Sequence, residues 1–295
     1  MNRLHTDLSM TRTETGRLAS SSPNLQNIPT RSKDGQKIRR GFISAPGCSL
    51  LSIDYSGIEM RVAAHMSQDP YMMQIFWEDM DIHTMTARRM FQKPEPEPID
   101  DKKERYPAKR TGFGVLYGIT AAGLVDVFYH DGVTTFSEAD CLQFIKDWFD
   151  TFPRVVNWID SVKAEARRTG MVRDMFGRVR YTPEVYSSLE YVRDAGLRQA
   201  VNAPIQSSAQ GIIKEAMKQL IPEYRAWQEG GFHVLPLMQI HDELIFEVED
   251  GILEWVIPQF KQIMVGAVEL SVPVKVDAEV GKNWANLEKW AMEGV

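Results

Sequence analysis

The sequence predicts an α+β fold, in which strands near both ends of the chain flank a mostly helical block. Three observations predict it: residues 48–55 form a short apolar run, residues 235–248 hold two apolar runs around a polar turn, and residues 272–280 alternate. Between the first two lie long segments with the apolar spacing of helices. With 295 residues, the chain is long enough for one large or two medium domains, each with a hydrophobic core.

The first predicted strand, CSLLSIDY, ends at Asp54 and Tyr55, and a helical pattern begins directly after it at Ser56. A strand that is followed at once by a helix places its last residues at an open edge, where functional groups tend to lie. Upstream of this strand, residues 18–30 are rich in Ser, Asn and Pro, which is typical of a loop.

The remaining elements follow from periodicity and from helix breakers. Residues 93–101 alternate Pro with acidic residues, which predicts an irregular connection. Apolar runs on both sides of His241, Asp242 and Glu243 predict a tight hairpin. The predicted helices are residues 105–128, 137–149, 152–170 and 190–220.

The composition excludes several classes of protein. Hydrophobic residues are 43% and charged residues 25% of the chain, which is typical of a globular domain and not of a disordered chain. No run reaches the roughly 20 apolar residues that span a bilayer, and the first residues lack the apolar core of a signal peptide. The two cysteines, Cys48 and Cys141, have no disulfide or zinc spacing, so we expect a cytoplasmic location and no membrane partner.

The net charge of −6 is the sum of very different regions. Residues 1–40 carry eight basic and three acidic residues, and residues 102–110 carry five basic and one acidic residue. Residues 241–295 carry eleven acidic and four basic residues. This asymmetry suggests a surface that faces a polyanion and a separate acidic surface, although solvated charge blocks would give the same pattern.

Asp54 and Asp242 are the first candidates for chemistry, because each follows a predicted apolar strand. A carboxylate beside a hydrophobic strand is costly unless it is paired or holds a metal ion. Two such acids on neighbouring strands would be able to hold two divalent cations for phosphoryl displacement, and Mg²⁺ prefers oxygen ligands of this kind. Acids at a strand end and in a hairpin turn are also common for purely structural reasons.

A second candidate group repeats every four residues and consists of Arg105, Lys109, Phe113 and Tyr117. In a helix, this spacing places the two cations and the two aromatic rings on one stripe about 120° wide. The cations suit a triphosphate and the rings suit a stacked base. The alternative is a pair of core aromatic residues after a solvated basic helix start.

A third group combines amides with arginines. Arg17, Asn24, Gln26 and Asn27 lie in the basic N-terminal stretch, and Arg198, Asn202 and Gln206 again recur every four residues. Amides and arginines of this kind reach base edges and sugars in a minor groove. Loop capping and ordinary helix surface would explain any one of them.

Together and in this order, these pieces resemble the polymerase domain of family A DNA polymerases, the type of bacterial DNA polymerase I and of T-odd phages. The resemblance covers nearly the whole chain and rests on seven segments. These are Thr15–Leu18 with Pro23–Pro29, Asp54–Arg61, Asp81–Thr84, Arg105–Gly118, Phe176–Arg178, Asn202–Gln206 and Gln239–Glu243.

The resemblance implies a right-hand polymerase fold with an antiparallel palm sheet, a mostly helical fingers subdomain and no thumb. It implies that residues 1–69 and 188–295 form the palm and that residues 70–187 form the fingers. It also implies a DNA-directed DNA polymerase that transfers a nucleotide from a dNTP to a primer 3′-hydroxyl on primer–template DNA, in a bacterial cell or an infected host cell.

The roles of individual residues are likewise implied by the resemblance. Asp54, Asp242 and the carbonyl of Tyr55 would hold two Mg²⁺ ions, with Glu243 assisting and Lys109 acting as general acid. Nucleotide contacts would come from His83, Arg105, Lys109, Phe113, Tyr117 and Glu59, the last excluding a ribose 2′-hydroxyl. DNA contacts would come from Arg17, Asn24, Asn27, Arg198, Asn202, Gln206 and His241.

Two departures and two alternatives accompany this interpretation. Gly57 replaces the usual Gln of the family, and the chain starts where the family's thumb has ended. We therefore expect the chain to be a fragment or to act as the C-terminal half of a split polymerase, in which case a separate N-terminal polypeptide carries the thumb and exonuclease domains. The alternatives are a relative that uses ribonucleotides and an inactive module that binds primer–template DNA.

Overall fold

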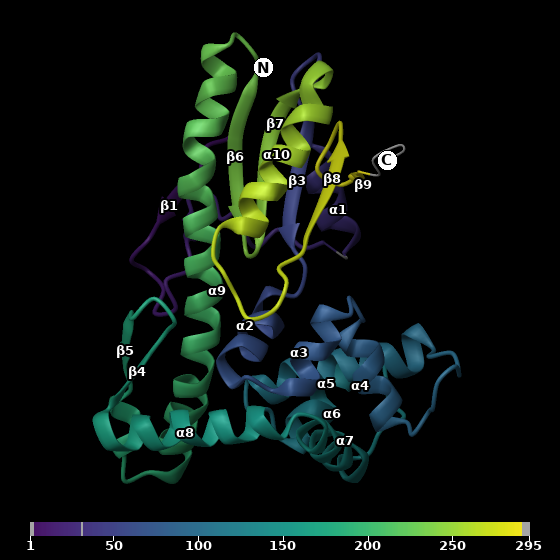
Figure 1. Ribbon diagram of the computed structural model, residues 1–295, viewed down its shortest axis with the longest axis vertical. Coiled ribbons are helices and arrows are strands. Elements are labelled where there is room, and N and C mark those ends of the chain that lie inside the picture. The colour runs from purple at the N-terminus through teal and green to yellow at the C-terminus, as the bar shows by residue number, and fades with distance from the viewer. Residues whose placement is uncertain (1–2, 31, 291–295) are drawn as a thin grey trace. The chain divides into compact units, whose positions relative to one another are not determined.

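The structure, a computed structural model, describes residues 3–30 and 32–290. It belongs to the predicted α+β class and divides into two compact units. The sheet unit comprises the described parts of residues 1–58, 207–269 and 274–295, and the helical unit comprises residues 59–206 and 270–273. Figure 1 shows the elements of both units coloured along the chain.

The strands are β1 (Asp7–Ser9), β2 (Ala19–Ser21), β3 (Cys48–Tyr55), β4 (Met171–Arg173), β5 (Val179–Tyr181), β6 (Val234–Ile240), β7 (Glu243–Glu249), β8 (Val276–Gly281) and β9 (Glu288–Lys289). The α-helices are α1 (Lys33–Arg40), α2 (Ile58–Ser67), α3 (Pro70–Trp77), α4 (Ile82–Met90), α5 (Tyr106–Leu116), α6 (Ala121–His130), α7 (Glu138–Thr151), α8 (Pro153–Thr169), α9 (Glu190–Glu229) and α10 (Leu253–Gly266). A π-helical turn, Asp101–Arg105, precedes α5, and two 3-10 turns span Pro183–Tyr186 and Asp250–Ile252.

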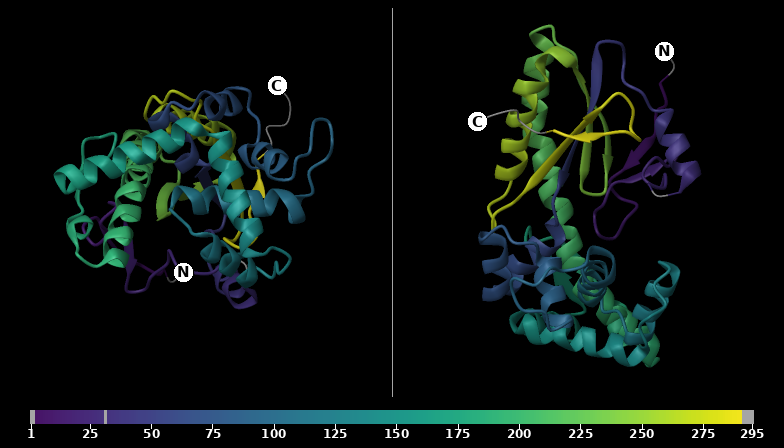
Figure 2. Two further views of the ribbon diagram at one scale, coloured as in Figure 1. Left: turned by 90° about the horizontal axis from the view of Figure 1, so that it is seen from below. Right: turned by 90° about the vertical axis from the view of Figure 1, so that its right-hand side faces the viewer.

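The sheet unit is built on a five-stranded antiparallel sheet in the order β6-β7-β3-β8-β9. The central strand β3 is apolar and buried along most of its length, as expected of a strand with neighbours on both edges. One face of the sheet packs on α10, where Phe246 of β7 contacts Phe260 with ring centroids 5.0 Å apart. On the same side, the hydroxyl of Tyr55 donates to the Met264 carbonyl of α10 at 2.7 Å. Figure 2 shows α9 and α10 along this side of the sheet.

The opposite face of the sheet carries Ser52 and Asp54, because side chains alternate along a strand. Here the N-terminal segment covers part of the sheet, and a small apolar cluster forms around Leu50 and Trp284. The guanidinium carbon of Arg39 from α1 lies 3.8 Å from the centre of the Trp284 ring. This face is therefore apolar at the end near Leu50 and Trp284, and polar and exposed at the end that carries Asp54.

The helical unit has its own core between α4, α5, α6 and α7. Ala108 of α5, Leu124 and Phe128 of α6, and Cys141 and Phe144 of α7 are buried together. Two residues of the predicted row of cations and rings lie on α5 outside this core, where Lys109 is exposed and Phe113 is half-buried. Both cysteines of the chain, Cys48 and Cys141, are buried free thiols.

The structure corrects the prediction of one helix over residues 105–128. The helix α5 ends at Leu116, and α6 begins only at Ala121. Gly118 lies between them with φ +70°, a left-handed conformation that glycine adopts without strain. The Thr120 hydroxyl then caps α6 by accepting from the Gly123 N–H at 3.1 Å.

Several other short elements were not predicted. The loop predicted at 18–30 contains the three-residue strand β2, which pairs with β1. The helix α10 has Pro258 in its interior, a residue that ordinarily argues against a helix. None of the helices in the described residues is both long enough and apolar enough to cross a bilayer.

Candidate functional site

Strand pairing brings the predicted carboxylates of the sheet unit together. Asp54, at the end of β3, lies directly opposite Glu243 on β7 and Asp277 on β8. His241 and Asp242 form the turn between β6 and β7, and the Tyr55 N–H donates to the Asp242 carbonyl at 3.2 Å. These acids line one cavity of about 780 Å³ within the sheet unit.

The acids of this cavity repel one another. Asp54 is solvent-exposed, yet its recessed position and then the charges of Asp242, Glu243, Asp277 and Glu279 raise its pKa to about 7. Burial also raises the pKa of Asp242, although Arg17 and His241 oppose the change. Burial raises the pKa of Glu243 against a hydrogen bond from the Ser52 hydroxyl at 2.5 Å.

The donor set of this cavity fits a divalent cation. The Oδ1 atom of Asp242 is buried without a hydrogen-bond partner, and the surrounding carboxylates favour any positive charge placed among them. Among the described residues, no three His, Cys, Asp or Glu side chains are arranged as a complete metal site. A cation here would therefore bind to Asp54 and Asp242 and complete its shell with main-chain, water or ligand oxygens.

Sequence analysis did not select Asp277, Glu279 or Arg39 for this cavity. Both acids project from β8 on the side of Asp54, since Asp277 is its cross-strand partner and Glu279 pairs with Ser52. The alternation of the predicted strand 272–280 was the available signal, because it places residues 277 and 279 on one face. No local pattern marks Arg39, which reaches the cavity from α1.

A smaller cavity of about 180 Å³ in the sheet unit collects the predicted N-terminal contacts. Arg17, Asn24, Asn27 and His241 all line it. The structure thus brings His241 together with three residues that lie more than 200 positions earlier in the chain. Its wall also includes Gln26, which sequence analysis grouped with Arg17, and the glutamines Gln210 and Gln239, which it did not select as site residues.

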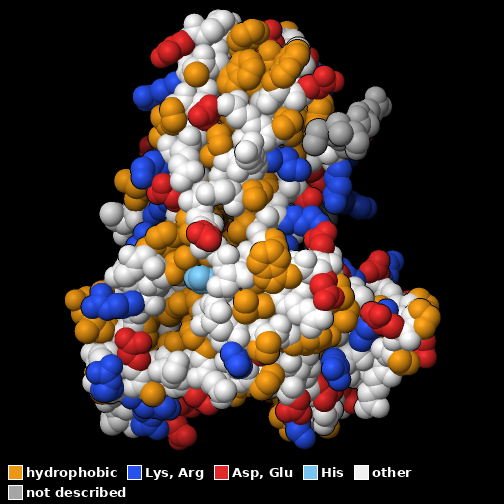
Figure 3. Space-filling model, in the orientation of Figure 1, with side chains coloured by type: hydrophobic (Ala, Val, Ile, Leu, Met, Phe, Trp, Pro, Cys, Tyr) orange, Lys and Arg blue, Asp and Glu red, His pale blue; other side chains and the backbone are white. Residues whose placement is uncertain are grey.

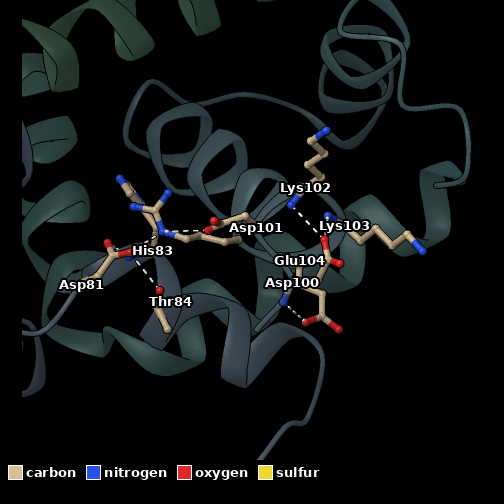
Figure 4. Close-up of polar contacts among 9 residues, drawn as sticks. Asp81, His83, Thr84, Asp100, Asp101, Lys102, Lys103 and Glu104 are labelled. Atoms are coloured by element: carbon tan, nitrogen blue, oxygen red, sulfur yellow. Dashed lines mark hydrogen bonds and ion pairs between the residues drawn. The ribbon is translucent and has the colours of Figure 1, made fainter. Parts of the chain in front are cut away.

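The predicted nucleotide contacts lie in the helical unit, around the start of α5. The side chain of Asp81 caps α4 by accepting from the His83 N–H at 3.1 Å and from the Thr84 hydroxyl at 2.9 Å (Figure 4). The same carboxylate forms an ion pair with Arg105. Sequence analysis matched Asp81 as part of a motif but gave it no role, and the structure shows that it positions Arg105.

His83 and Phe113 form the aromatic part of this region. Their ring centroids lie 5.6 Å apart at a tilt of 45°. Burial lowers the pKa of His83 to about 4, against the charge of Asp81 and with further lowering by Lys109 and Arg105. His83 is therefore a neutral hydrogen-bonding group at pH 7, beside the exposed cation Lys109.

The far end of α5 gathers four of the other predicted residues. The Tyr117 hydroxyl donates to the buried carboxylate of Glu59 on α2. In the orientation that its surroundings favour, the Asn202 amide donates to the Leu116 carbonyl at 3.1 Å and to the Arg198 carbonyl at 3.2 Å. The third predicted residue of α9 is Gln206, at which the stretch 59–206 of the helical unit ends.

Comparisons with known proteins identify the family of the chain. The family model of DNA polymerase family A matches residues 1–286, so the chain belongs to this family. It is 43% identical to DNA polymerase I of Rhizobium leguminosarum over 288 residues, which are 96% of the chain and 27% of that protein. It is 42% identical to the thermostable DNA polymerase I of Thermus aquaticus over 287 residues, 97% of the chain and 33% of that protein.

A solved structure gives the same result for the fold. The POL domain of Pol1 from M. smegmatis, in complex with DNA primer-template and dNTP, is similar with a TM-score of 0.86 and 37% identity. The match covers 96% of this chain and 48% of that one. The chain thus spans about a third or less of the length of the curated relatives named above.

Proposed function

We propose that the chain is the catalytic part of a DNA-directed DNA polymerase, which extends a primer 3′-hydroxyl on a DNA template with dNTPs. The observation that carries the proposal is the pair Asp54 and Asp242, with an unpartnered carboxylate oxygen, in a chain of this family. The structurally similar Pol1 domain was solved with primer-template and dNTP, which supports the same partners here.

In this proposal the palm is residues 1–69 and 188–295, which include the whole sheet unit, and the fingers are residues 70–187 of the helical unit. Asp54 and Asp242, with the carbonyl of Tyr55, would hold two Mg²⁺ ions, and Glu243 would keep the acidic cluster in place through Ser52. Two bound ions supply activation of the 3′-hydroxyl and neutralisation of the leaving pyrophosphate. Its recessed position and then the neighbouring acids raise the pKa of Asp54, and cations would relieve the repulsion among these acids on binding.

The helical unit would bind the incoming nucleotide. Arg105 and the exposed Lys109 would contact the triphosphate, with neutral His83 as a hydrogen-bond donor. Asp81 would hold the Arg105 guanidinium in position through their ion pair. Lys109 would also donate a proton to the leaving pyrophosphate, and Phe113 would stack on the nucleotide.

The remaining residues would select and align the substrates. Tyr117 would order the templating base, and Glu59, fixed by its bond with Tyr117, would exclude a ribose 2′-hydroxyl. The primer–template end would lie against Arg17, His241, Asn24 and Asn27, which share one cavity. The residues of α9 that would contact DNA are Arg198, Asn202 and Gln206. The separate polypeptide with thumb and exonuclease domains stays a prediction.

Primer extension with Mg²⁺ at low salt tests the proposal. We expect Asp242→Asn to lower the rate by roughly 100-fold or more, since even the loss of a residue that only supports a metal ligand costs about 10- to 100-fold. The matched control is Asp250→Asn, which makes the same change at a carboxylate paired with Lys282 outside the cavity. Equal extension by the parent and Asp242→Asn would contradict the metal assignment.

A further inference from the structure

Three glutamine side chains converge on the turn that carries Asp242. The Gln239 amide donates to the His241 carbonyl at 2.5 Å, and the Gln210 amide donates to the same oxygen at 3.3 Å. Gln26 in turn donates to the side-chain oxygen of Gln239 at 3.1 Å and to its main-chain carbonyl at 3.0 Å. Thus α9 and β6 meet at one main-chain oxygen next to Asp242, and the N-terminal segment contacts Gln239 behind it.

Gln210 is the unexpected member of this group. Gln210 is only 1% exposed, and the residues near it on α9 are buried and apolar, namely Ala209, Ile212 and Ile213. An amide in such a place costs free energy unless it is hydrogen-bonded, so an apolar residue would be the ordinary choice for packing alone. Its amide nitrogen donates to the His241 carbonyl, which satisfies part of this requirement.

The turn itself needs external support. His241 has φ +52°, a left-handed conformation that is strained for a residue with a side chain. Such a conformation persists only where surrounding contacts hold it. The structure holds this turn from two sides, by the glutamines at the His241 carbonyl and by the Tyr55 N–H at the Asp242 carbonyl.

We propose that Gln210 is a positioning residue for Asp242, a role that rests on the function proposed above. Its amide fixes the His241 carbonyl, and with it the direction in which the next residue presents its carboxylate. Gln239 acts on the same oxygen, and Gln26 keeps Gln239 oriented. Loss of the Gln210 donor would leave the Asp242 carboxylate in place but less well aimed at a bound cation.

The variant Gln210→Met tests this, because it keeps the length of the side chain and removes its donor. We expect Mn²⁺ binding, measured by electron paramagnetic resonance titration, to weaken by about 10-fold, as for other losses of support behind a metal ligand. In primer extension we expect kcat to fall by a similar factor and the KM for dNTP to stay within about twofold, since the nucleotide contacts proposed for α4 and α5 are untouched.

The matched control is Gln219→Met on the same helix. Its amide also donates to a main-chain carbonyl, that of Ala267 at 3.2 Å, but Gln219 does not line either cavity. We expect the control to bind Mn²⁺ and to extend primers like the parent. Equal losses in Gln210→Met and Gln219→Met would overturn the proposal, because they would indicate general packing of α9.

The same measurements distinguish three further outcomes. Parent-like Mn²⁺ affinity and kcat in Gln210→Met would also overturn the proposal. Should Gln210→Met fail to fold, Gln239→Met removes the other donor to the same oxygen, and we expect the same pattern from it. A parent that binds Mn²⁺ but extends no primer would count against the proposed function, while the Mn²⁺ comparison would still decide the role of Gln210.

Discussion

Glu247 is a buried carboxylate that the proposed catalytic roles leave unused. Its side chain is 1% exposed and accepts from Arg3 at 2.6 Å, from the Ala45 N–H at 2.9 Å and from His233 at 2.7 Å. Burial alone would raise the pKa of Glu247, but the hydrogen bonds from Arg3, Ala45 and His233 outweigh it and lower the pKa. The fold therefore favours the charged form of Glu247. The ion pair of this carboxylate with Arg3 connects the N-terminal segment to β7.

We predict that Glu247→Gln lowers the free energy of unfolding by about 2 kcal/mol at pH 7, the value of hydrogen bonds to a charged group. A folded pKa below the unfolded value of about 4.3 stabilises the parent above that pH, and the stabilisation is lost as the pH falls through the folded pKa. The difference between parent and variant should thus shrink below about pH 4. Urea unfolding at several pH values measures it.

The control for this prediction is Glu288→Gln, at an exposed carboxylate on β9. We expect this variant to unfold like the parent at every pH, because a solvated carboxylate contributes little. A difference between parent and Glu247→Gln that stayed constant from pH 7 to pH 3 would refute the charge argument, since a packing effect does not titrate.

Among the elements, the strands that carry the acids were the most predictable part. The predicted strand 48–55 coincides with β3, and the predicted hairpin 235–248 corresponds to β6 and β7. Continuous apolar runs are characteristic of central strands, and His241 and Asp242 interrupt them at the turn. The pairing of Asp54 with Asp277 was not predictable, because it depends on which strand occupies the second edge of β3.

Helix ends were less predictable, because single residues decide them. The row Arg105 to Tyr117 was expected on one helix, and it lies on the π-helical turn, on α5 and on the residue that caps α5. The change of direction at Gly118 is set by its left-handed conformation and by Arg198, which packs against it from α9. A contact between residues 80 positions apart leaves no local signal in the sequence.

We predict that Gly118→Ala is more damaging than an ordinary glycine replacement. A Cβ at Gly118 would lie 2.8 Å from Arg198 Cγ, in addition to the strain of a left-handed alanine. Gly132→Ala is the matched control, because Gly132 has φ +80° but open space around its Cβ position. The control should lose about 1 kcal/mol from strain alone, and Gly118→Ala should lose more.

Primer extension should separate the two glycine variants further. The clash moves Arg198 or the segment that follows Tyr117, so we expect Gly118→Ala to raise the KM for dNTP while Gly132→Ala leaves it unchanged. Thermal unfolding provides the comparison of stability. Equal melting temperatures for the two variants would show that the Arg198 side chain adapts without cost.

At the scale of the whole molecule, net charge is a poor guide to the partner. A chain of net charge −6 belongs to a family of DNA polymerases. On the face in Figure 3, basic and acidic side chains are interspersed. Some of the basic residues are paired within the fold, as Arg3 is with Glu247 and Arg110 is with Asp131. The binding of a polyanion therefore depends on which basic side chains line the cavities. Arg17 lines the smaller cavity, together with Asn24 and Asn27.

This leads to a prediction about salt. If Arg17 contacts a DNA phosphate, its removal should lower the salt dependence of primer–template binding, because each neutralised phosphate adds about −0.9 to the slope of log K against log salt concentration. We expect Arg17→Ala to bind more weakly at low salt and to reduce that slope by about one.

Lys37→Ala is the control, since Lys37 lies in the same basic stretch but is exposed and paired with Asp34 outside both cavities. Fluorescence anisotropy between 50 and 200 mM salt measures both slopes. A slope that falls equally in the two variants would mean that the N-terminal charge attracts DNA as a whole, whereas a fall in Arg17→Ala alone assigns the contact to one cavity.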